Sequence, residues 1–573
     1  MRSHIEIGFE NFRKYEYLEP IELRNITYLV GENNSGKSTF VKGALLMINN
    51  LLNPKFREFD SPEFDFNIPN NPQLLGINVP TFESALNRNA DTPEITFICR
   101  IKRCVDHQFM DYLFEIIVSN DSVEKNSGHG TIKKFYITDF ANCLKYNFAD
   151  RQIWIENIAP TQEYINELTR DLAGINLYLK SFNNRLEHIY RKYNYNLGLS
   201  CLFENLSDDE IEDPDINPMG GYSDSDSLYV DEKIYLEDLM NALLKKIDWL
   251  QKNAATYKAK ETKKKNYYAL QSPYKTLIEV LHSNQSDSDK EIASSLKTFF
   301  ETENVKEIEG KIDKIASDID KCIASLSYVK YIYAHDSKQQ FIYNSLDLSD
   351  KTAQMVSLYA GKFGSRIADD LYEEFMGSWL NRFGIDKYII TEAVGDGLYK
   401  VYLSPTQPEK SKENPDTYIN RNNWRPLATY GTGIIRIALL IMNLANILFD
   451  YMVKDNMNRR AMPIVIIEEP EMNLHPKYQS LLADLFLELS ERYGFRFIIE
   501  THSEYMIRKT QVEVKNSRYE SPEALNALNP FQVLYFPQNE DPYQMEYRTD
   551  GRFKNKFGKG FYDEANSLIF QII

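Results

Sequence analysis

The chain has 573 residues, enough for about three or four domains of ordinary size. Hydrophobic residues make up 43% of the sequence and charged residues 26%, a composition that supports a packed core and excludes wholesale disorder. The formal net charge is −17, so no overall positive field attracts nucleic acid, and any such contact must use a local basic patch.

The cysteines and the apolar stretches indicate the compartment. The five cysteines are scattered without a CxxC pair, which argues against a disulfide framework and a structural zinc site. The first residues lack the apolar core of a signal peptide, and the longest apolar stretch, residues 434–449, is interrupted by Arg436. We therefore expect a cytoplasmic chain with no membrane span.

The N-terminal part predicts a strand, a glycine-rich turn and a helix in direct succession. Ile26–Val30 suits a buried strand, and apolar residues recur at helical spacing from Phe40 to Leu52. The turn between them, GENNSGKS, fits the phosphate-binding loop pattern, in which backbone amides curl around an anion at a helix start. The expected nucleotide-binding residues are Gly31, Asn33, Asn34, Ser35, Gly36, Lys37, Ser38 and Thr39.

Two of these side chains have distinct expected tasks. Lys37 would neutralise charge on the β- and γ-phosphates, and the Ser38 hydroxyl would hold Mg²⁺.

Strand-like segments at residues 94–100 and 112–118 follow a loop rich in Pro and Asn.

The middle of the chain, residues 141–330, predicts a helical insertion. Apolar residues from Ile165 to Tyr193 step by threes and fours, which is a heptad seam, and a second seam runs from Val305 to Leu326. A projecting coiled-coil arm and the ordinary helices of a compact bundle both fit this pattern. Between the seams, the acidic run 204–232 reads as a flexible loop.

One basic and aromatic cluster lies between the two seams, after the acidic run. The cluster has two interpretations, a solvated helix face or a contact to nucleic acid, and the solvated helix face is favoured. Its members are Tyr257, Lys258, Lys260, Lys263, Lys264, Lys265, Tyr267 and Tyr268.

After residue 331 the α/β pattern returns with a second candidate site. The apolar strand Ile464–Ile467 delivers Glu468 and Glu469 to the carboxyl edge of a sheet, where phosphates lie in such folds. Successive strand side chains point opposite ways, so Glu468 would support the Mg²⁺ shell and Glu469 would polarise the attacking water. A helix is expected from Pro476 to Leu489.

Three further features extend this candidate site. His502 follows the buried strand 495–500 and would donate a hydrogen bond to the γ-phosphate or the attacking water. A turn formed by Gly431, Thr432 and Gly433 opens an apolar helix and would present amides to an anion, although a plain tight turn has the same sequence. His475 is either the cap of the next helix or a contact to nucleotide or a partner subunit.

Taken in order, these motifs resemble the ATP-binding-cassette (ABC-type) ATPases of the RecF, structural-maintenance-of-chromosomes (SMC) and OLD (overcoming lysogenisation defect) group. The resemblance is carried by the first hairpin at residues 7–13, the Walker A segment 26–39, the Walker B and D-loop segment 468–476, and the histidine switch 501–503. It implies an α/β ATPase head split by a helical, coiled-coil-like insertion. The head would comprise residues 1–140 and 331–573.

The resemblance also implies a mechanism shared between subunits. The segment Thr429–Gly433, with Gly431, Thr432 and Gly433 as its contact residues, would form the signature loop, which in this family reaches the γ-phosphate bound by the other subunit of a dimer. Two ATP molecules, each with Mg²⁺, would lie between two heads. Glu468 stands where many relatives have Asp, and the signature loop lacks the common Ser-Gly-Gly-Gln sequence. Both departures are compatible with slow ATP hydrolysis.

The partner is expected to be a separate protein. Only about 70 residues follow His502, less than a nuclease domain needs, and this ending is similar to that of stand-alone OLD-like ATPases of the Septu and PARIS antiphage systems. We therefore expect an ATP-driven sensor or scaffold, oligomeric through its heads and helical insertion, that controls a separately encoded effector, a nuclease. The alternative is a DNA-repair or DNA-end clamp of the RecF and SMC type.

Overall fold

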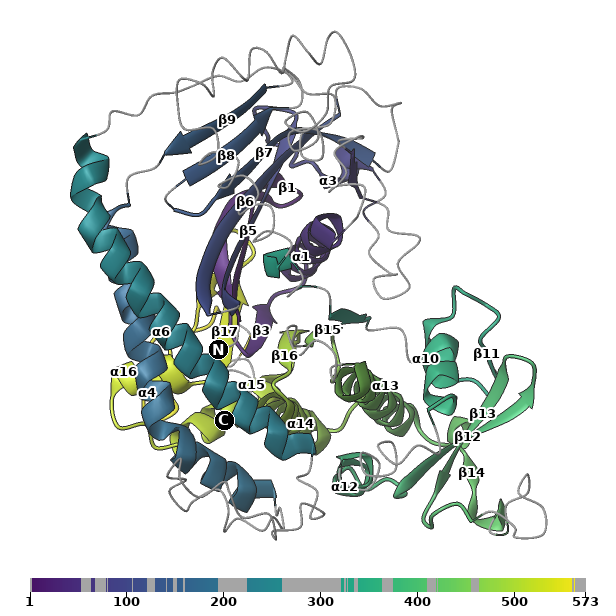
Figure 1. The fold of residues 1–573 in the computed structure, drawn as a ribbon. Helices are drawn as coiled ribbons and strands as arrows, with labels where there is room; N and C mark the ends of the chain where they lie inside the picture. Colours follow the sequence, from purple (N-terminus) through teal and green to yellow (C-terminus); the bar gives the residue numbers. More distant parts are fainter. Residues whose placement is uncertain are drawn as a thin grey trace, which may run out of the picture.

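The computed structural model describes residues 3–52, 63–66, 79, 81–105, 107–120, 129–140, 142–147, 152–157, 160–193, 224–259, 321–323, 326, 328–333, 339–362, 375–409, 419, 421–454, 463–558 and 561. These residues form three β-sheets with helices packed on and between them (Figure 1). The chain therefore has the mixed α/β class that the sequence predicts.

The central sheet has six strands in the order β10-β15-β16-β3-β17-β18, and all are parallel except the edge strand β18. Every residue of β3, β15, β16 and β17 is buried, as expected for parallel strands that are covered on both faces. The strands are β10 (Val329–Ile332), β15 (Ile464–Glu468), β16 (Arg496–Glu500), β3 (Ile26–Gly31), β17 (Phe531–Phe536) and β18 (Tyr543–Gln544).

Alternate side chains of the central strands enter two different cores. Ile466 and Ile498 pack into the core that contains helix α1 (Lys37–Leu52). Val465 and Phe497 point to the opposite face. That face is covered by α13 (Thr432–Lys454), α14 (Pro476–Tyr493) and α15 (Glu504–Asn516).

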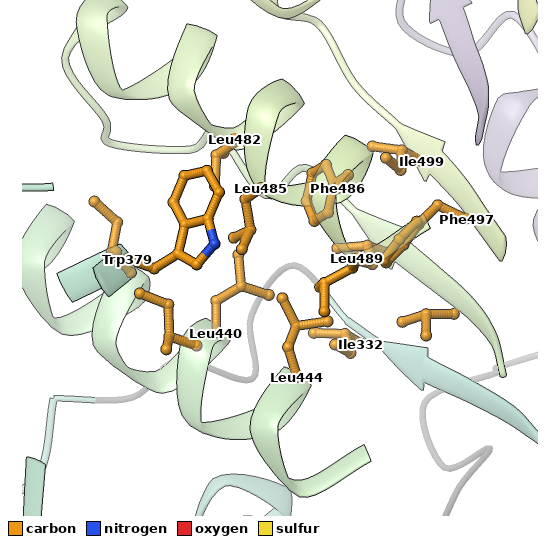
Figure 2. Packing of buried hydrophobic residues seen from close by; sticks show 14 of the residues in the cluster. Ile332, Trp379, Leu440, Leu444, Leu482, Leu485, Phe486, Leu489, Phe497 and Ile499 are labelled. Carbon is orange, nitrogen blue, oxygen red and sulfur yellow. The ribbon is translucent and has the colours of Figure 1, made fainter. Parts of the chain in front are cut away.

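Figure 2 shows the second core at close range. Leu440 and Leu444 of α13 meet Leu485 and Leu489 of α14, and Phe497 of β16 closes the layer. Within the described residues, α13 is the one helix that is long and apolar enough to cross a membrane, but 67% of its apolar window is buried inside the structure. The apolar character of α13 is thus accounted for by this core packing.

A second, antiparallel sheet of eight strands covers the other side of α1. Its order is β2-β1-β5-β6-β7-β8-β9, with β4 paired to β7. The strands are β1 (Ser3–Phe12), β2 (Tyr15–Leu23), β4 (Glu63–Asp65), β5 (Glu94–Val105), β6 (Gln108–Ser119), β7 (His129–Thr138), β8 (Asn142–Asn147) and β9 (Gln152–Asn157). The short helix α3 (Phe82–Ala85) lies beside it.

The structure differs from the sequence expectation where this sheet ends. The segment from residue 141 was expected to be helical, yet β8 and β9 pair antiparallel and continue the sheet to Asn157. In β9 the run Ile153-Trp154-Ile155 is β-branched and aromatic, a composition that favours a strand over a helix. The helical part of the chain begins only at Gln162.

Two long helices, α4 (Gln162–Tyr193) and α6 (Asp224–Ala259), lie side by side next to the sheets (Figure 1). Leu168 and Ile175 of α4 share a core with Leu236 and Leu243 of α6. The first heptad seam is therefore a helix, and its partner is α6. The second seam lies outside the described residues apart from residues 321–323 and 326, and so does most of the basic and aromatic cluster.

The acidic run 204–232 was expected to be a loop, and this is wrong for its last part. Residues 224–232 form the start of α6, while residues 204–223 lie outside the described residues. Acidic residues favour the first turn of a helix because they offset the positive end of its dipole, so a high negative charge does not exclude a helix here.

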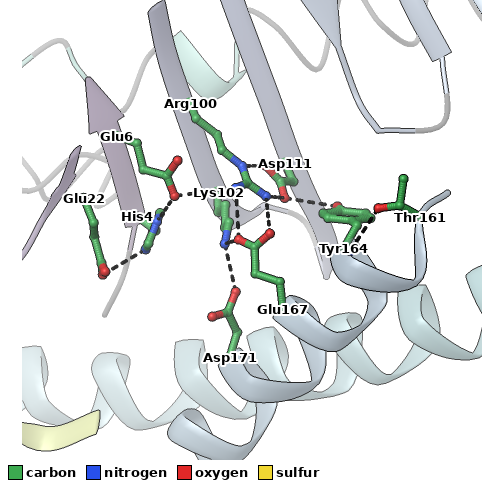
Figure 3. A network of polar contacts seen from close by, with 10 residues as sticks. All are labelled: His4, Glu6, Glu22, Arg100, Lys102, Asp111, Thr161, Tyr164, Glu167 and Asp171. Atoms are coloured by element: carbon green, nitrogen blue, oxygen red, sulfur yellow. Dashed lines mark hydrogen bonds and ion pairs between the residues drawn. The ribbon is translucent and has the colours of Figure 1, made fainter. Parts of the chain in front are cut away.

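A network of charged side chains joins α4 to the antiparallel sheet (Figure 3). Arg100 of β5 forms a bidentate pair with Asp111 of β6, at 2.9 and 2.8 Å. Tyr164 of α4 donates a hydrogen bond to the same carboxylate, and Glu167 of α4 pairs with Arg100 and Lys102. Since Asp111 is almost wholly buried, this pairing is what makes its charge tolerable.

The third sheet belongs to a smaller lobe between β10 and α13 in the sequence. It has the order β11-β13-β12, with β14 paired to β13. Its elements are β11 (Tyr343–Asn344), α10 (Lys351–Ala360), α12 (Gly377–Arg382), β12 (Tyr388–Gly395), β13 (Leu398–Ser404), η3 (Arg421–Asn423), β14 (Arg425–Pro426) and η4 (Leu427–Thr429). One further helix, α16 (Pro522–Leu528), packs near α4.

Candidate functional site

The glycine-rich turn lies between β3 and the start of α1, as predicted. Gly31 and Gly36 have φ values of +147° and +110°, and Asn34 has +61°, so the turn uses backbone conformations that other residues rarely adopt. A Cβ on Gly31 would lie 2.2 Å from the carbonyl oxygen of Phe536 in β17. The close approach of β17 to the turn therefore requires glycine at position 31.

Lys37 begins α1 and folds back over its own loop. Its Nζ donates hydrogen bonds to the carbonyl oxygens of Gly31 and Glu32, at 3.1 and 2.8 Å. Burial lowers the pKa of Lys37, while the negative charges of Glu500 and Glu469 act to raise it. The ammonium group thus lies among carboxylates, where it can exchange loop carbonyls for phosphate oxygens.

The first hairpin holds the loop from its other side. Lys14 Nζ donates to the carbonyl oxygens of Ser35 and Pro537, at 2.5 and 3.1 Å, and the Tyr15 hydroxyl donates to that of Gly36 at 2.8 Å. Sequence reasoning missed Lys14 and Tyr15, because nothing local in the sequence indicates that this hairpin turn reaches the loop. Asn33 and Asn34 are exposed at the rim, and Ser35 is buried beneath it.

Glu468 and Glu500 end neighbouring parallel strands, at paired positions of β15 and β16. The Ser38 hydroxyl donates a hydrogen bond of 2.7 Å to Oε1 of Glu500. Sequence reasoning missed Glu500 as a site residue, although it occupies the same strand-end position as Glu468, and that signal could have identified it.

The oxygens around Ser38 fit a divalent cation. Glu468 is 8% exposed and Glu500 5% exposed, and Oε2 of Glu500 has no hydrogen-bond partner among the described residues. Burial raises the pKa of Glu468 to about 7, and the charge of Glu500 adds to this effect. Burial also raises the pKa of Glu500. Hydroxyl and carboxylate oxygens are the ligands that Mg²⁺ takes in proteins, so these three residues could hold it.

Glu469 and His502 face each other on the open side of the site. Glu469 has a positive φ of 44°, and its amide donates to the carbonyl oxygen of Glu500 at 2.8 Å, which turns its side chain away from Glu468. Its Oε1 lies 4.0 Å from Nε2 of His502, and each side chain is about one-third exposed. Burial and the charge of Lys37 lower the pKa of His502, which favours the neutral imidazole.

The turn that carries His502 is held by a further carboxylate. The backbone amide of His502 donates a hydrogen bond of 2.6 Å to Oε1 of Glu471. Ser503 caps α15 by accepting from the amide of Met506 and donates to Gln479 of α14. Sequence reasoning missed Glu471, which positions His502 through the backbone.

The Gly-Thr-Gly turn lies at the start of α13, beside the segment that follows β15. Gly431 and Thr432 are exposed, and no heavy atom lies within 4 Å of a Cβ built on Gly431. Gly433 instead approaches Asn473, whose carbonyl oxygen lies 3.0 Å from a Cβ built at position 433. No backbone hydrogen bond among the described residues joins this turn to the loop. The start of α13 is therefore open to a group from outside the chain.

His475 is a helix cap, as one of its two interpretations predicted. It is the N-cap of α14, where its Nδ1 accepts a hydrogen bond of 3.3 Å from the amide of Lys477. Pro476 occupies the first helical turn, and Gly494 ends the helix in a left-handed conformation.

Comparison with known proteins gives a family and several structural neighbours. The AAA ATPase domain family model (AAA_15) matches residues 1–507. No curated protein matches the chain. Similar solved structures include the Smc head domain of Pyrococcus furiosus with an extended coiled coil, bound to the C-terminal domain of ScpA. It has 10% identity and a TM-score of 0.25, with 100% of this chain and 99% of that chain covered.

Two further structures are similar at the same level. A SmcHead bound to the C-winged helix domain of ScpA has 10% identity, a TM-score of 0.29 and coverage of 96% of both chains. The recombination mediator protein RecF with ATPrS has 12% identity, a TM-score of 0.25 and coverage of 88% of this chain and 94% of that chain.

Proposed function

The chain belongs to the AAA ATPase domain family, and on this premise we propose that it binds ATP with Mg²⁺ at the loop of residues 31–39 and hydrolyses it to ADP and phosphate as an ABC-type ATPase. The observation that carries the proposal is the meeting of Lys37, Glu469 and His502, which come from three separate segments, at one edge of the central sheet. Carboxyl edges of parallel strands are where α/β folds bind nucleotides.

The proposed roles follow from the geometry of each side chain. The loop amides and Lys37 bind the phosphates, and Ser38 with Glu468 holds Mg²⁺, which supplies charge neutralisation at the phosphates when bound. Glu469 lies on the open side, where it accepts the proton of the attacking water. His502, neutral and within 4.0 Å of Glu469, orients the same water or the γ-phosphate through a hydrogen bond.

We assign the completion of this site to a second copy of the chain. Gly431, Thr432 and Gly433 lie open at the N-terminus of α13, where free amides and the helix dipole favour an anion. In the proposed dimer this turn meets the γ-phosphate held by the other copy. ATP then favours the closed dimer because both heads contact it, whereas an open head contacts it from one side.

The biological role that we propose is that of a sensor or scaffold in bacterial antiphage defence. The closed and open states would hold and release a separately encoded effector, a nuclease, in the cytoplasm. This extension rests on the sequence resemblance to stand-alone OLD-like ATPases. In this arrangement residues 1–140 and 331–573 form the head, and β8 and β9 join it from the insertion of residues 141–330.

A substitution at Gly431 tests the completion by a second copy. The space around its Cβ position is open, so Gly431→Glu fits within one chain but sets a negative charge against the partner's γ-phosphate. We expect Gly431→Glu to bind ATP as the wild type does, to stay monomeric by mass measurement in ATP, and to lose hydrolysis. Gly431→Ala is the matched control and should dimerise. A Gly431→Glu variant that dimerises and hydrolyses ATP normally would contradict the shared site.

Two observations test the effector role: the identity of the neighbouring genes, and the effect of DNA on the rate of ATP hydrolysis. A nuclease gene next to this one, whose product co-purifies with the chain in ATP and separates in ADP, would support the sensor. Hydrolysis that DNA stimulates in a salt-dependent manner, with no such partner, would instead support the DNA clamp.

A further inference from the structure

The hydrogen bond of the Ser38 hydroxyl indicates a role for Glu500, a residue outside the Walker motifs, in orienting that hydroxyl. A serine hydroxyl has one proton and two lone pairs, and the proton of Ser38 is committed to Glu500 Oε1 at 2.7 Å. Both lone pairs are then left for a cation. Glu500 lies between Glu468 on β15 and Leu29 on β3, so the strand order holds its carboxylate directly behind the loop.

The same carboxylate has a second oxygen with no partner. Oε2 of Glu500 is buried without a hydrogen bond from the described residues. Burying such an oxygen unpaired is costly, and a divalent cation beside Ser38 is the group that would satisfy it. The site therefore lacks a partner for this oxygen until a cation is present.

Carboxylates outnumber the ammonium group of Lys37 at this site, which gives a second reason for a cation. Glu469, Glu471 and Glu500 all act electrostatically on Lys37, and Glu500 also acts on Glu468. A triphosphate without its cation would add further negative charge to this set. With the cation bound, the carboxylate of Glu500 attracts it and the repulsion becomes an attraction.

We propose that Glu500 is a positioning residue that couples ATP binding to the divalent cation: it orients the Ser38 hydroxyl for the cation and repels ATP that lacks one. This inference rests on the proposed function and adds to it a residue outside the Walker motifs. By linkage, the cation increases ATP affinity and ATP increases cation affinity by the same factor.

The test compares the binding of a fluorescent ATP analogue in EDTA and in excess Mg²⁺, with Mn²⁺ binding followed by electron paramagnetic resonance. Glu500→Gln keeps an acceptor for Ser38 but removes the charge. We expect the wild type to bind the nucleotide far more tightly with Mg²⁺, and the ratio of the two affinities to fall by about 5- to 150-fold in Glu500→Gln. Glu523→Gln, at an exposed position of α16, should keep the wild-type ratio.

A second variant separates charge from folding. Glu500→Asp keeps the charge on a shorter side chain, so it should still exclude metal-free nucleotide while binding Mn²⁺ more weakly. A wild-type ratio in a folded Glu500→Gln protein would overturn the role of Glu500, and so would a wild type that binds both forms of the nucleotide equally. A wild type that binds neither form would overturn the proposed function itself.

Discussion

Oε1 of Glu469 lies 4.0 Å from Nε2 of His502, although the two residues follow different strands of the central sheet. The pair arises because β15 and β16 are parallel neighbours that end at the same level. Glu469 turns outward through its positive φ, and Glu471 holds the His502 amide, so both side chains face the open side of the site.

Glu469→Gln tests the role of this pair in hydrolysis. The amide keeps the size of the side chain but cannot accept a proton from water, so we expect ATP turnover to fall by about 10²- to 10⁴-fold with ATP binding retained. Closed dimers should accumulate in ATP, which size-exclusion chromatography with mass measurement would detect. Wild-type turnover in this variant would exclude Glu469 as the general base.

Gly31→Ala tests the close approach of β17 to the phosphate-binding loop. The added Cβ would meet the Phe536 carbonyl at 2.2 Å, and alanine rarely adopts the φ of Gly31, which costs about 1–3 kcal/mol before the clash is counted. We expect a lower midpoint of thermal unfolding and weaker nucleotide binding. Gly174→Ala, in α4 with its nearest atom at 3.7 Å, is the matched control and should be neutral or stabilising. Equal behaviour of the two variants would contradict the packing described for Gly31.

Arg100→Ala tests the junction between the antiparallel sheet and α4. Removal of the guanidinium leaves the buried charge of Asp111 without its bidentate partner, which destabilises proteins by about 3–5 kcal/mol. The free energy of unfolding, measured by urea denaturation, should fall accordingly. In a double-mutant cycle, adding Asp111→Asn should recover much of the loss. Independent, additive effects of the two changes would show that they do not interact.

His4 should make stability depend on pH in the alkaline range. Burial lowers the pKa of His4, but hydrogen bonds to Glu22 and Glu6 outweigh it and raise the pKa from 6.5 to about 9. The folded state therefore holds its proton more tightly than the unfolded state. The stabilisation is complete below pH 6.5 and is lost as the pH rises through about 9.

The measurement is the free energy of unfolding across this range. We expect the wild type to lose about 1–3 kcal/mol between pH 6.5 and 9, and His4→Gln to lose less. The charged groups that face His4 are Glu6, Glu22 and Lys102, and none of these carboxylates has a pKa raised into this window. Parallel pH profiles of the two proteins would contradict the pairing.

The local features of the site could be predicted from the sequence. The turn before Lys37, the strand before Glu468 and the strand before His502 are each encoded in a short segment, because apolar runs and glycine positions determine them locally. The cap role of His475 was likewise one of two local alternatives, and the structure confirms it.

The remaining features depend on pairing between distant segments. Glu500 reaches Ser38 because β16 lies between β15 and β3, and this strand order is not encoded in any one segment. Lys14 and Tyr15 reach the loop because the first hairpin folds over it. The start of α6 was mistaken for a loop because its charge outweighed its helical pattern, whereas packing against α4 stabilises the helix.

The most direct test of the central claim is equilibrium binding of ATP with Mg²⁺ to the wild type and to Lys37→Ala, by isothermal titration calorimetry on the full chain. Lys37 lies buried between the loop carbonyls and the carboxylates of the site, so removal of its ammonium group takes away the positive charge at the start of α1. We predict one saturable site per chain in the wild type and no measurable binding in a folded Lys37→Ala protein. Equal affinity of the two proteins for ATP would contradict the assignment of this site.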